Sequence, residues 1–375
     1  MNILILNYEY PPIGGGAAPV SKDLATELAS NGHAVSVLTM KYGDAPDVIN
    51  EDGVTVHRLK CIRRKKASCS PIEQLSYLIA VRKYMKNHKE LQNYDVCHAH
   101  FVIPTAEVAK YIKRKYGIPY IITAHGSDVE GHNTKKTVML MHRVLRYSWR
   151  RIVSEAFCVV SPSMYLLDRM KRNYSGGKYV FCPNGIDYEL FSGLKDNTKK
   201  EKRILVMGRI QKFKNVQFII SAFSKIIGYE DWKIDLVGDG PYRKEIEMMI
   251  ENLKLEDRVC MVGWLDNKSE QLLERLKTAS IYVSASQFEN CPMSVIESAT
   301  AGCYPLVSDI PAHRQLLSEE YLFSIDSEQE LIDKMVERMS IGRCSYKIDM
   351  KKYDWKVITN QYEDVMRSAL KEKGK

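Results

Sequence analysis

A regular alternation of short β-rich runs with stretches of helical apolar spacing constrains the fold of this chain more than any other feature. In the first half, β-rich runs lie near Asn2–Leu6, Ala34–Thr39, Val54–Arg58, Asp95–Ala99, Tyr120–Thr123, Phe157–Ser161 and Tyr179–Cys182. The segments between them, such as Val20–Ser30, carry apolar residues at helical spacing. Strands and helices that alternate in this way form a parallel sheet with helices on both faces. The first half is therefore predicted to be an α/β domain.

The same alternation restarts after Asn184, with further β-rich runs near Ile204–Met207, Lys233–Val237, Val259–Val262, Ile281–Ser284 and Pro305–Val307. At roughly 150 residues per domain, a chain of 375 residues has room for two. We predict two Rossmann-like, doubly wound α/β domains, residues 1–186 and 187–355, with a polar linker at Asp187–Glu201. Residues 356–375 are predicted to form a C-terminal helix that packs back on the first domain. Ligands bind beyond the carboxyl ends of parallel strands, so two such domains would face a cleft.

Composition excludes several other classes of protein. The chain is 45% hydrophobic and 27% charged, which is typical of globular proteins and excludes disordered, collagen-like and repeat architectures. We find no uncharged apolar run near the ~18 residues of a membrane span, and no signal-peptide pattern at the N-terminus. The nine cysteines are scattered without a C-x-x-C pair, as free thiols in a reducing compartment would be. We therefore expect a cytoplasmic protein.

The net charge of +9 is distributed unevenly. Residues 1–190 contain 26 Lys and Arg against 17 Asp and Glu, whereas the remaining residues contain 29 of each. The cations gather in three clusters: Arg63-Arg64-Lys65-Lys66; Lys110 with Lys113-Arg114-Lys115; and Arg143 with Arg146, Arg150 and Arg151. A basic surface can serve nucleic acid, an anionic membrane or a phosphorylated small molecule, and a merely solvated face is the alternative for each cluster.

The loop after the first strand contains Gly14, Gly15 and Gly16 in succession and precedes a helix. Glycines let the backbone approach a ligand, and the start of the helix supplies free N–H groups. The loop fits neither G-x-G-x-x-G nor G-K-[ST], so dinucleotide-binding and P-loop functions are poorly supported. Contact with a phosphate or sugar and a plain tight turn both remain open.

Several histidines lie at or near strand ends in the first half. His125, followed by Gly126, comes directly after the run Tyr120–Thr123 and is either a site residue or a core histidine. His98 and His100 lie on one face of a strand, but no third residue has a spacing that would complete a metal site.

In the second half, polar residues follow three strands. Gly208, Arg209 and Lys214 come after the first, and the two cations suit a diphosphate unless they are simply solvated. Gly238 follows the next strand in a turn that could accommodate a flat base. Glu289 and Glu297 flank the segment that Pro292 would start as a helix, and two carboxylates at this spacing can accept hydrogen bonds from sugar hydroxyls.

Taken together, these segments resemble the retaining glycosyltransferases of family 4, which have the GT-B fold. The resemblance runs almost end to end, through Gly14-Gly15-Gly16, Asp95-Val96-Cys97-His98-Ala99-His100, His125-Gly126-Ser127-Asp128, Pro183-Asn184-Gly185-Ile186-Asp187, Gly208-Arg209 with Lys214, Val237-Gly238-Asp239-Gly240-Pro241 and the pair Glu289-x7-Glu297. Two positions depart from the family pattern. Asn215 replaces the usual glycine after the lysine, and the loop Glu289-Asn290-Cys291-Pro292 replaces Glu-Gly-Phe-Gly, which leaves the identity of the transferred sugar open.

The resemblance implies roles for particular residues. Arg209 and Lys214 would stabilise the leaving diphosphate, Glu289 would hold sugar hydroxyls, and His125 would lie near the reaction centre. Glu297 would hold the ribose. The other implied donor-binding residues are Gly15, Gly16, Gly208, Gly238, Asn290, Cys291, Pro292, Met293 and Ser294.

The expected function is retaining, metal-independent transfer of a sugar from a UDP- or GDP-linked donor to a hydroxyl of a saccharide or lipid-linked acceptor, in cell-surface polysaccharide or glycolipid synthesis. The first domain would bind the acceptor and the second the nucleotide sugar. No cofactor is expected beyond the donor, and no nucleic acid partner, because aromatic residues do not interleave with the basic clusters. Peripheral attachment to the anionic inner face of the cell membrane is compatible with the charge. A GT-B 2-epimerase, a phosphorylase and a non-catalytic sugar-binding relative are the alternatives, since one fold hosts many functions.

Overall fold

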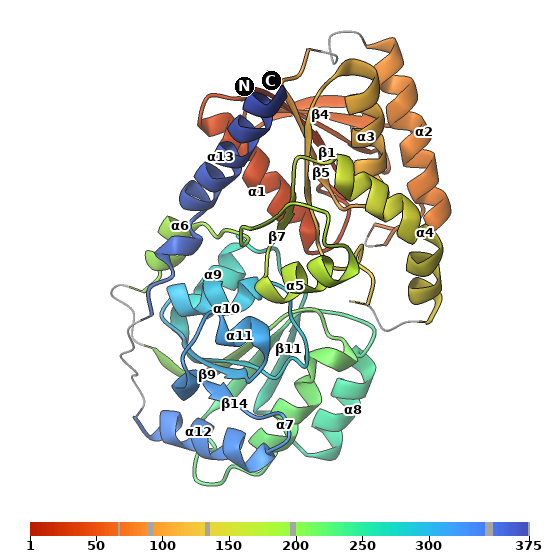
Figure 1. Ribbon diagram of the computed structural model, residues 1–375. Coiled ribbons are helices and arrows are strands. Elements are labelled where there is room, and N and C mark those ends of the chain that lie inside the picture. The colour runs from red at the N-terminus through yellow and green to blue at the C-terminus, as the bar shows by residue number, and fades with distance from the viewer. Residues whose placement is uncertain (67, 89–92, 132–135, 196–199, 342–347, 374–375) are drawn as a thin grey trace. The chain divides into compact units, whose positions relative to one another are not determined.

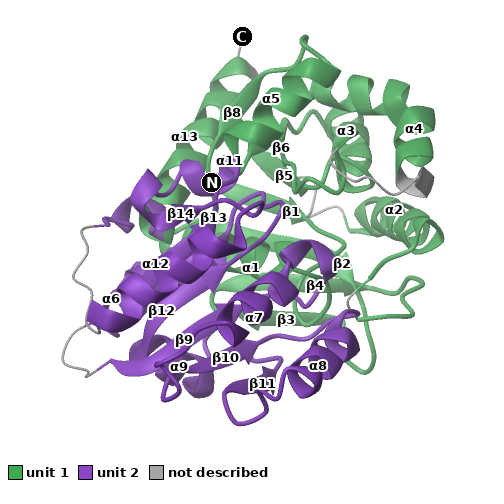
Figure 2. Ribbon diagram, turned by 90° about the horizontal axis from the view of Figure 1, so that it is seen from below, with its two compact units in different colours: residues 1–185, 355–375 green, residues 186–354 purple. Residues whose placement is uncertain are grey.

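The computed structural model describes residues 1–66, 68–88, 93–131, 136–195, 200–341 and 348–373. The chain divides into two compact units, which we describe separately (Figure 2). Unit 1 comprises Met1–Gly185 together with Trp355–Lys375, and unit 2 comprises Ile186–Asp354. Figure 1 labels their helices and strands.

Unit 1 contains an eight-stranded sheet in the order β3-β4-β2-β1-β5-β6-β7-β8. Its strands are β1 (Asn2–Leu6), β2 (Ala34–Met40), β3 (Val48–Glu51), β4 (Val54–Leu59), β5 (Val96–His100), β6 (Tyr120–Thr123), β7 (Val159–Ser161) and β8 (Tyr179–Phe181). Its helices are α1 (Ala17–Ser30), α2 (Pro71–Asn87), α3 (Thr105–Tyr116), α4 (Lys136–Glu155), α5 (Met164–Asn173) and α13 (Trp355–Lys373). All neighbouring strands are parallel except β3, which is antiparallel to β4 at the edge.

Helices cover both faces of this sheet, so successive residues of β1 enter different cores. Ile3 and Ile5 pack with residues of α1 and α13 in one core. Leu4 and Leu6 pack with residues of α2 and α3 in the other. The C-terminal helix α13 therefore belongs to unit 1, and it lies beside α1 (Figure 1). Strands that are buried on both faces consist mostly of consecutive apolar residues, and such runs can be recognised in the sequence.

Unit 2 contains a six-stranded parallel sheet in the order β11-β10-β9-β12-β13-β14. Its strands are β9 (Glu201–Met207), β10 (Lys233–Val237), β11 (Val259–Gly263), β12 (Ala279–Ser284), β13 (Tyr304–Ser308) and β14 (Leu322–Phe323). Its helices are α6 (Tyr188–Ser192), α7 (Val216–Ser224), α8 (Arg243–Asn252), α9 (Glu270–Thr278), α10 (Met293–Thr300), α11 (Pro311–Arg314) and α12 (Glu328–Ile341), with short 3₁₀ turns at η2 (Lys212–Lys214), η3 (Glu319–Tyr321) and η4 (Lys351–Tyr353). In chain order the strands run 3-2-1-4-5-6, the arrangement of a doubly wound Rossmann-type sheet.

Both units thus have the parallel α/β architecture of the GT-B fold predicted from the sequence. The structure corrects the predicted linker, because residues 188–192 form α6. Asp187 caps this helix by accepting a hydrogen bond from the Leu190 N–H, and Phe191 is buried in the core of unit 2. Strands β3 and β14 were not predicted, since one is a mostly exposed edge and the other has two residues. Among the described residues, none of the helices combines the length and apolarity needed to cross a bilayer.

Candidate active site

The order of strands in unit 2 identifies where a ligand would bind. The sequence of connections reverses between β9 and β12, which are adjacent in the sheet. Ligands of open α/β sheets bind at such a switch point, outside the carboxyl ends of the two strands. The segments that follow these strands contain Arg209 and Lys214 after β9, and Glu289 after β12. The topology therefore brings together residues that lie 75 positions apart in the sequence.

Glycines allow the segments after β9 and β10 to run in close contact. The Gly208 N–H donates to the Val237 carbonyl over 3.0 Å, and the Ile210 N–H to the Asp239 carbonyl over 2.9 Å. A Cβ atom on Gly238 would lie 1.9 Å from the Gly208 oxygen, and one on Gly240 would lie 2.2 Å from the Ile210 oxygen. The fold therefore requires glycine at 238 and 240, apart from any role in binding.

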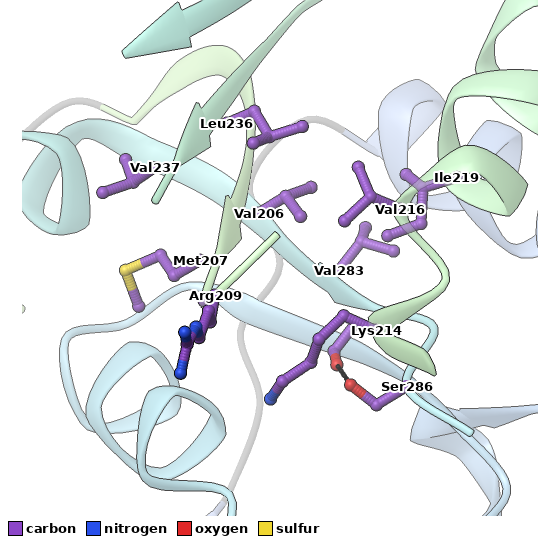
Figure 3. Close-up of a pocket in the computed structure, with 12 residues that line it drawn as sticks. Val206, Met207, Arg209, Lys214, Val216, Ile219, Leu236, Val237, Val283 and Ser286 are labelled. Atoms are coloured by element: carbon purple, nitrogen blue, oxygen red, sulfur yellow. Dashed lines mark hydrogen bonds between the residues drawn. The ribbon is translucent and has the colours of Figure 1, made fainter. Parts of the chain in front are cut away.

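Arg209 and Lys214 border a pocket at the end of β9. Figure 3 shows both side chains pointing the same way from the strand ends, below apolar side chains such as Val206 and Leu236. Arg209 is exposed, whereas Lys214 is half-buried at the end of the turn η2. Asn215, which follows, has φ +55° in the left-handed region. Glycine and asparagine adopt this conformation most readily, which explains why Asn215 can replace the usual glycine of the family pattern.

Lys214 and Glu289 form an ion pair at the switch point. Lys214 Nζ lies 2.5 Å from Glu289 Oε1, and the hydroxyl of Ser286 donates to the same carboxylate oxygen over 2.7 Å. The side chains of Lys214 and Glu289 are 21% and 13% exposed. The Ser286 carbonyl in turn accepts a 2.6 Å hydrogen bond from the Ser308 hydroxyl. The carboxylate is therefore fixed from two sides, next to a cation that faces the pocket.

Helix α10 carries the remaining predicted residues of this unit. It begins at Met293, with Pro292 as its N-cap rather than its first residue. Ser294 lies in the first turn, where its hydroxyl forms a 2.8 Å hydrogen bond with that of Tyr282. Glu297 lies in the second turn and is 9% exposed. Asn290 and Cys291 are partly buried in the loop between Glu289 and this helix.

In unit 1 the three glycines after β1 differ in what the fold requires of them. Gly14 has φ +104°, and a Cβ atom there would lie 2.7 Å from Glu9 Cβ. A Cβ atom on Gly15 or Gly16 would have no atom within 4 Å. Gly16 is the N-cap of α1 with φ −62°, a conformation open to any residue. Packing thus accounts for Gly14, whereas Gly15 and Gly16 leave open space at the start of a helix.

His125 follows β6 and is held by two groups that the sequence reading did not assign. The backbone N–H of His125 donates to Asp128 Oδ1 over 3.0 Å, and the ring Nε2 of His125 lies 3.1 Å from Nδ1 of His100 on β5. The other oxygen of Asp128 accepts a 2.7 Å hydrogen bond from the Val102 N–H. Burial lowers the pKa of His125 to about 3, so the ring is neutral at pH 7. Burial also raises the pKa of Asp128.

The predicted residues therefore fall into two groups, one in each unit. Unit 2 brings together Lys214, Glu289 and the segment 208–209, and unit 1 contains His125 with Gly15 and Gly16. Neither the contact of Ser286 with Glu289 nor that of His100 with His125 was predicted from the sequence, in which His100 was considered as a metal ligand. Within the described residues, no group of three or more His, Cys, Asp or Glu side chains is arranged to hold a metal ion.

Comparison with known families covers most of the chain. Residues 14–190 match the family described as Glycosyltransferase Family 4, and residues 192–347 match that described as Glycosyl transferases group 1. The first match ends and the second begins close to the boundary between the two compact units at Gly185 and Ile186.

Relatives and solved structures agree with these matches. The chain is 23% identical to N-acetyl-alpha-D-glucosaminyl L-malate synthase of Bacillus anthracis, over 97% of this chain and 96% of that protein. It is 25% identical to alpha-monoglucosyldiacylglycerol synthase of Streptococcus pneumoniae, over 85% of this chain and 74% of that protein. The structure of HepE from Anabaena in complex with UDP-glucose superimposes with a TM-score of 0.71 at 16% identity, over 98% of this chain and 100% of that one.

Proposed function

The chain is a GT-B glycosyltransferase of the family 4 type, and from this premise we propose that it is a retaining enzyme. It moves a sugar from a nucleotide-diphosphate donor to a hydroxyl group of a saccharide or a lipid-linked acceptor. The observation that carries the proposal is the ion pair between Lys214 and Glu289, which lies where a Rossmann-type sheet binds its ligand.

The pair offers the two kinds of contact that a sugar diphosphate needs. The Lys214 ammonium, with the exposed guanidinium of Arg209 on the same side, would neutralise the diphosphate as the bond to the sugar breaks (Figure 3). The Glu289 carboxylate would accept hydrogen bonds from sugar hydroxyls. Because Ser286 already bonds one carboxylate oxygen, Glu289 is oriented before the donor arrives. Glu297, Gly208, Gly238 and residues 290–294 complete the proposed donor site.

The proposed reaction breaks the bond between the anomeric carbon and the diphosphate oxygen, and forms a bond from that carbon to the acceptor oxygen on the same face. The acceptor hydroxyl loses its proton to the departing phosphate, so the donor itself supplies the base. This route needs neither a covalent enzyme intermediate nor a cofactor, and we propose that it needs no metal because two cations balance the developing charge. In unit 1, we propose that His125 contacts the sugar and that the open space at Gly15 and Gly16 admits substrate.

The relatives suggest the classes of donor and acceptor. HepE was solved with UDP-glucose, so we propose a uridine-linked donor. One relative is named for a product that contains malate, a dicarboxylic acid, and the other for a product that contains diacylglycerol, a membrane lipid. An acceptor that is anionic or that lies in an anionic membrane fits the basic residues 1–190.

We propose in addition that the outer face of α4 docks on an anionic bilayer. Leu140, Val144 and Tyr147 form a row at helical spacing and are 65%, 73% and 73% exposed. Arg143, Arg150 and Arg151 are exposed on the same helix, and Glu155 at its end is the only acidic residue that it contains. An apolar row flanked by arginines is typical of helices that lie in the interface of an anionic membrane.

Vesicle co-sedimentation tests the docking surface. The full chain should sediment with vesicles that contain anionic phospholipid and not with neutral ones. Replacing Leu140, Val144 and Tyr147 with serine should abolish this, whereas the control Ile227→Ser, which removes an 86% exposed apolar side chain of unit 2, should not. Equal sedimentation of wild type and the triple variant, or self-association that the triple variant removes, would overturn the assignment.

The proposed activity is tested by incubating the purified protein with a panel of UDP- and GDP-sugars and measuring nucleotide release. Release should occur with one donor and increase with the matching acceptor. The anomeric configuration of the product, determined by NMR, should equal that of the donor. An inverted product would refute retention, and a 2-epimerised sugar without transfer would show the alternative enzyme class.

A further inference from the structure

Three histidines lie side by side in unit 1, two on β5 and one directly after β6. His98 and His100 of β5 are fully buried, with ring centroids 4.4 Å apart. The ring of His100 stacks on that of His125 at 5.3 Å with an interplanar angle of 14°. Burial lowers the pKa of His98 to about 3 and lowers the pKa of His100 well below its ordinary value. All three rings are therefore neutral at pH 7, and each carries one N–H.

The partners of His98 show a structural role. Its Nε2 lies 2.8 Å from the Thr123 hydroxyl, which forms a 3.1 Å hydrogen bond with the hydroxyl of Tyr362 on α13. The ring of His98 also contacts that of Tyr362. His98 thus anchors the C-terminal helix to the sheet.

His100 differs, because its hydrogen bond goes to His125. The bond joins His100 Nδ1 to His125 Nε2 over 3.1 Å, and within the described residues Nε2 of His100 has no hydrogen-bond partner. Phe101, the next residue, has φ +75° and places its ring 4.6 Å from that of His125. A bulky residue rarely adopts this left-handed conformation, which costs backbone energy, and here it places the Phe101 ring against those of His125 and Tyr8.

One proton lies between the two rings, and its position fixes the tautomer of His125. If His125 Nε2 carried this proton, His100 would have to be protonated on its own Nε2, which would then be a buried donor without an acceptor. If His100 Nδ1 carries it, His100 Nε2 is an unprotonated nitrogen and leaves no donor unpaired. Buried N–H groups without a partner are rarer than unmet acceptors, so the second arrangement is favoured.

We propose that His100 is a positioning residue whose Nδ1–H donates to Nε2 of His125. This hydrogen bond orients the ring of His125 and keeps the proton of His125 on Nδ1 of that ring. His125 then presents an N–H to an oxygen of the sugar and acts as a hydrogen-bond donor, not as a base. The kinetic consequence rests on the proposed function of His125, whereas the tautomer does not.

The test uses the full chain labelled with ¹⁵N-histidine. Nitrogen chemical shifts distinguish protonated from unprotonated ring positions, and the His125 signals are those absent from His125→Asn. Wild type should show His125 protonated on Nδ1, and His100→Ala should lose this preference. His100→Asn should retain it, because an amide N–H can occupy the place of Nδ1. His98→Ala is the matched control: it removes a ring equally buried on the same strand and should leave the tautomer unchanged.

Kinetics supply the second measurement. His100→Ala should lower kcat/KM by about 10–100-fold, the usual cost of losing a group that orients a functional side chain, and His100→Asn should recover most of it. Protonation of His125 on Nε2 in wild type, or an unchanged tautomer in His100→Ala, would overturn the positioning role whatever the activity. If the tautomer of His125 shifts in His100→Ala but the wild-type protein transfers no sugar, the positioning role of His100 is kept and the proposed function is refuted.

Discussion

Removing the Lys214 ammonium should impair turnover far more than folding. The side chain is 21% exposed and lies 2.5 Å from Glu289 at the switch point of unit 2. In Lys214→Ala, the departing diphosphate loses a stabilising cation and meets a carboxylate that has lost its counter-ion. Part of the defect should therefore come from Glu289.

Two estimates give the size of the effect. Unit charges about 4 Å apart interact by about 4 kcal/mol at an effective dielectric constant of about 20. Loss of one group that stabilises developing charge typically costs about 10²–10³ in kcat, or about 2.7–4 kcal/mol. We therefore expect kcat to fall by about 10²–10³. A partly exposed ion pair contributes only about 1 kcal/mol or less to stability, so the variant should fold.

Steady-state kinetics with the identified donor would measure this effect, with thermal unfolding as a check on folding. Lys212→Ala is the matched control, because Lys212 belongs to the same 3₁₀ turn and is exposed. Adding Glu289→Gln to Lys214→Ala should restore part of the donor affinity but not kcat. Near-normal turnover of Lys214→Ala, or an equal loss in Lys212→Ala, would refute the leaving-group role.

Three further predictions concern glycines and pH. Gly16→Ala should leave the melting temperature unchanged, because a Cβ atom there would meet no atom within 4 Å. It should lower kcat/KM if substrate occupies that space, and unchanged kinetics would count against the proposed role of Gly16 in binding. Gly238→Ala should destabilise the protein by about 2–4 kcal/mol in urea unfolding, since it adds a steric clash to a positive φ. Gly32→Ala is the control, because Gly32 also has a positive φ (+83°) but its Cβ would meet no atom, and it should lower the free energy of unfolding by about 1–2 kcal/mol. Equal losses of stability in Gly238→Ala and Gly32→Ala would refute the role of the clash. With the folded pKa of His98 near 3 and an unfolded value near 6.5, the unfolded state binds more protons between these values, and stability is lost as the pH falls. His98 should lower the free energy of unfolding by roughly 2 kcal/mol between pH 7 and 5. In urea unfolding at a series of pH values, the free energy of unfolding of His98→Gln should fall less steeply with decreasing pH.

The sequence predicted the parallel strands well and the edge strands poorly, for a physical reason. Strands such as β1 and β12 are buried on both faces, so apolar residues follow one another in Ile3–Leu6 and Ile281–Val283, and these runs are visible without knowledge of the fold. Strand β3 is mostly exposed and reads Val-Ile-Asn-Glu, and its pairing with β4 depends on tertiary structure. The predicted linker failed because α6 has only five residues, so its apolar side chains Tyr188, Leu190 and Phe191 make too short a run to show helical periodicity.

Site residues could be predicted one at a time, but their pairings could not. Lys214 and Glu289 meet only because β9 and β12 are neighbours, and chain order alone does not state this. The bond between His100 and His125 likewise depends on the register of β5 against β6. Glycines carry the same ambiguity: Gly238 and Gly16 look alike in the sequence, yet backbone contact requires the former and leaves the latter open.

The structure also changes what the positive charge of residues 1–190 means. Several of its cations are neutralised within unit 1, since Lys110 pairs with Glu107, Arg114 with Glu155 and Arg146 with Glu130. A count of charges therefore overstates what a partner would meet. On α4, other exposed arginines lie beside exposed leucine, valine and tyrosine side chains. Nucleic acid is bound mainly through its phosphates and through stacking or polar edges of its bases, so a row of exposed aliphatic side chains contributes little to binding it. A bilayer uses both kinds of residue, so the combination supports a membrane-bound acceptor better than the net charge alone.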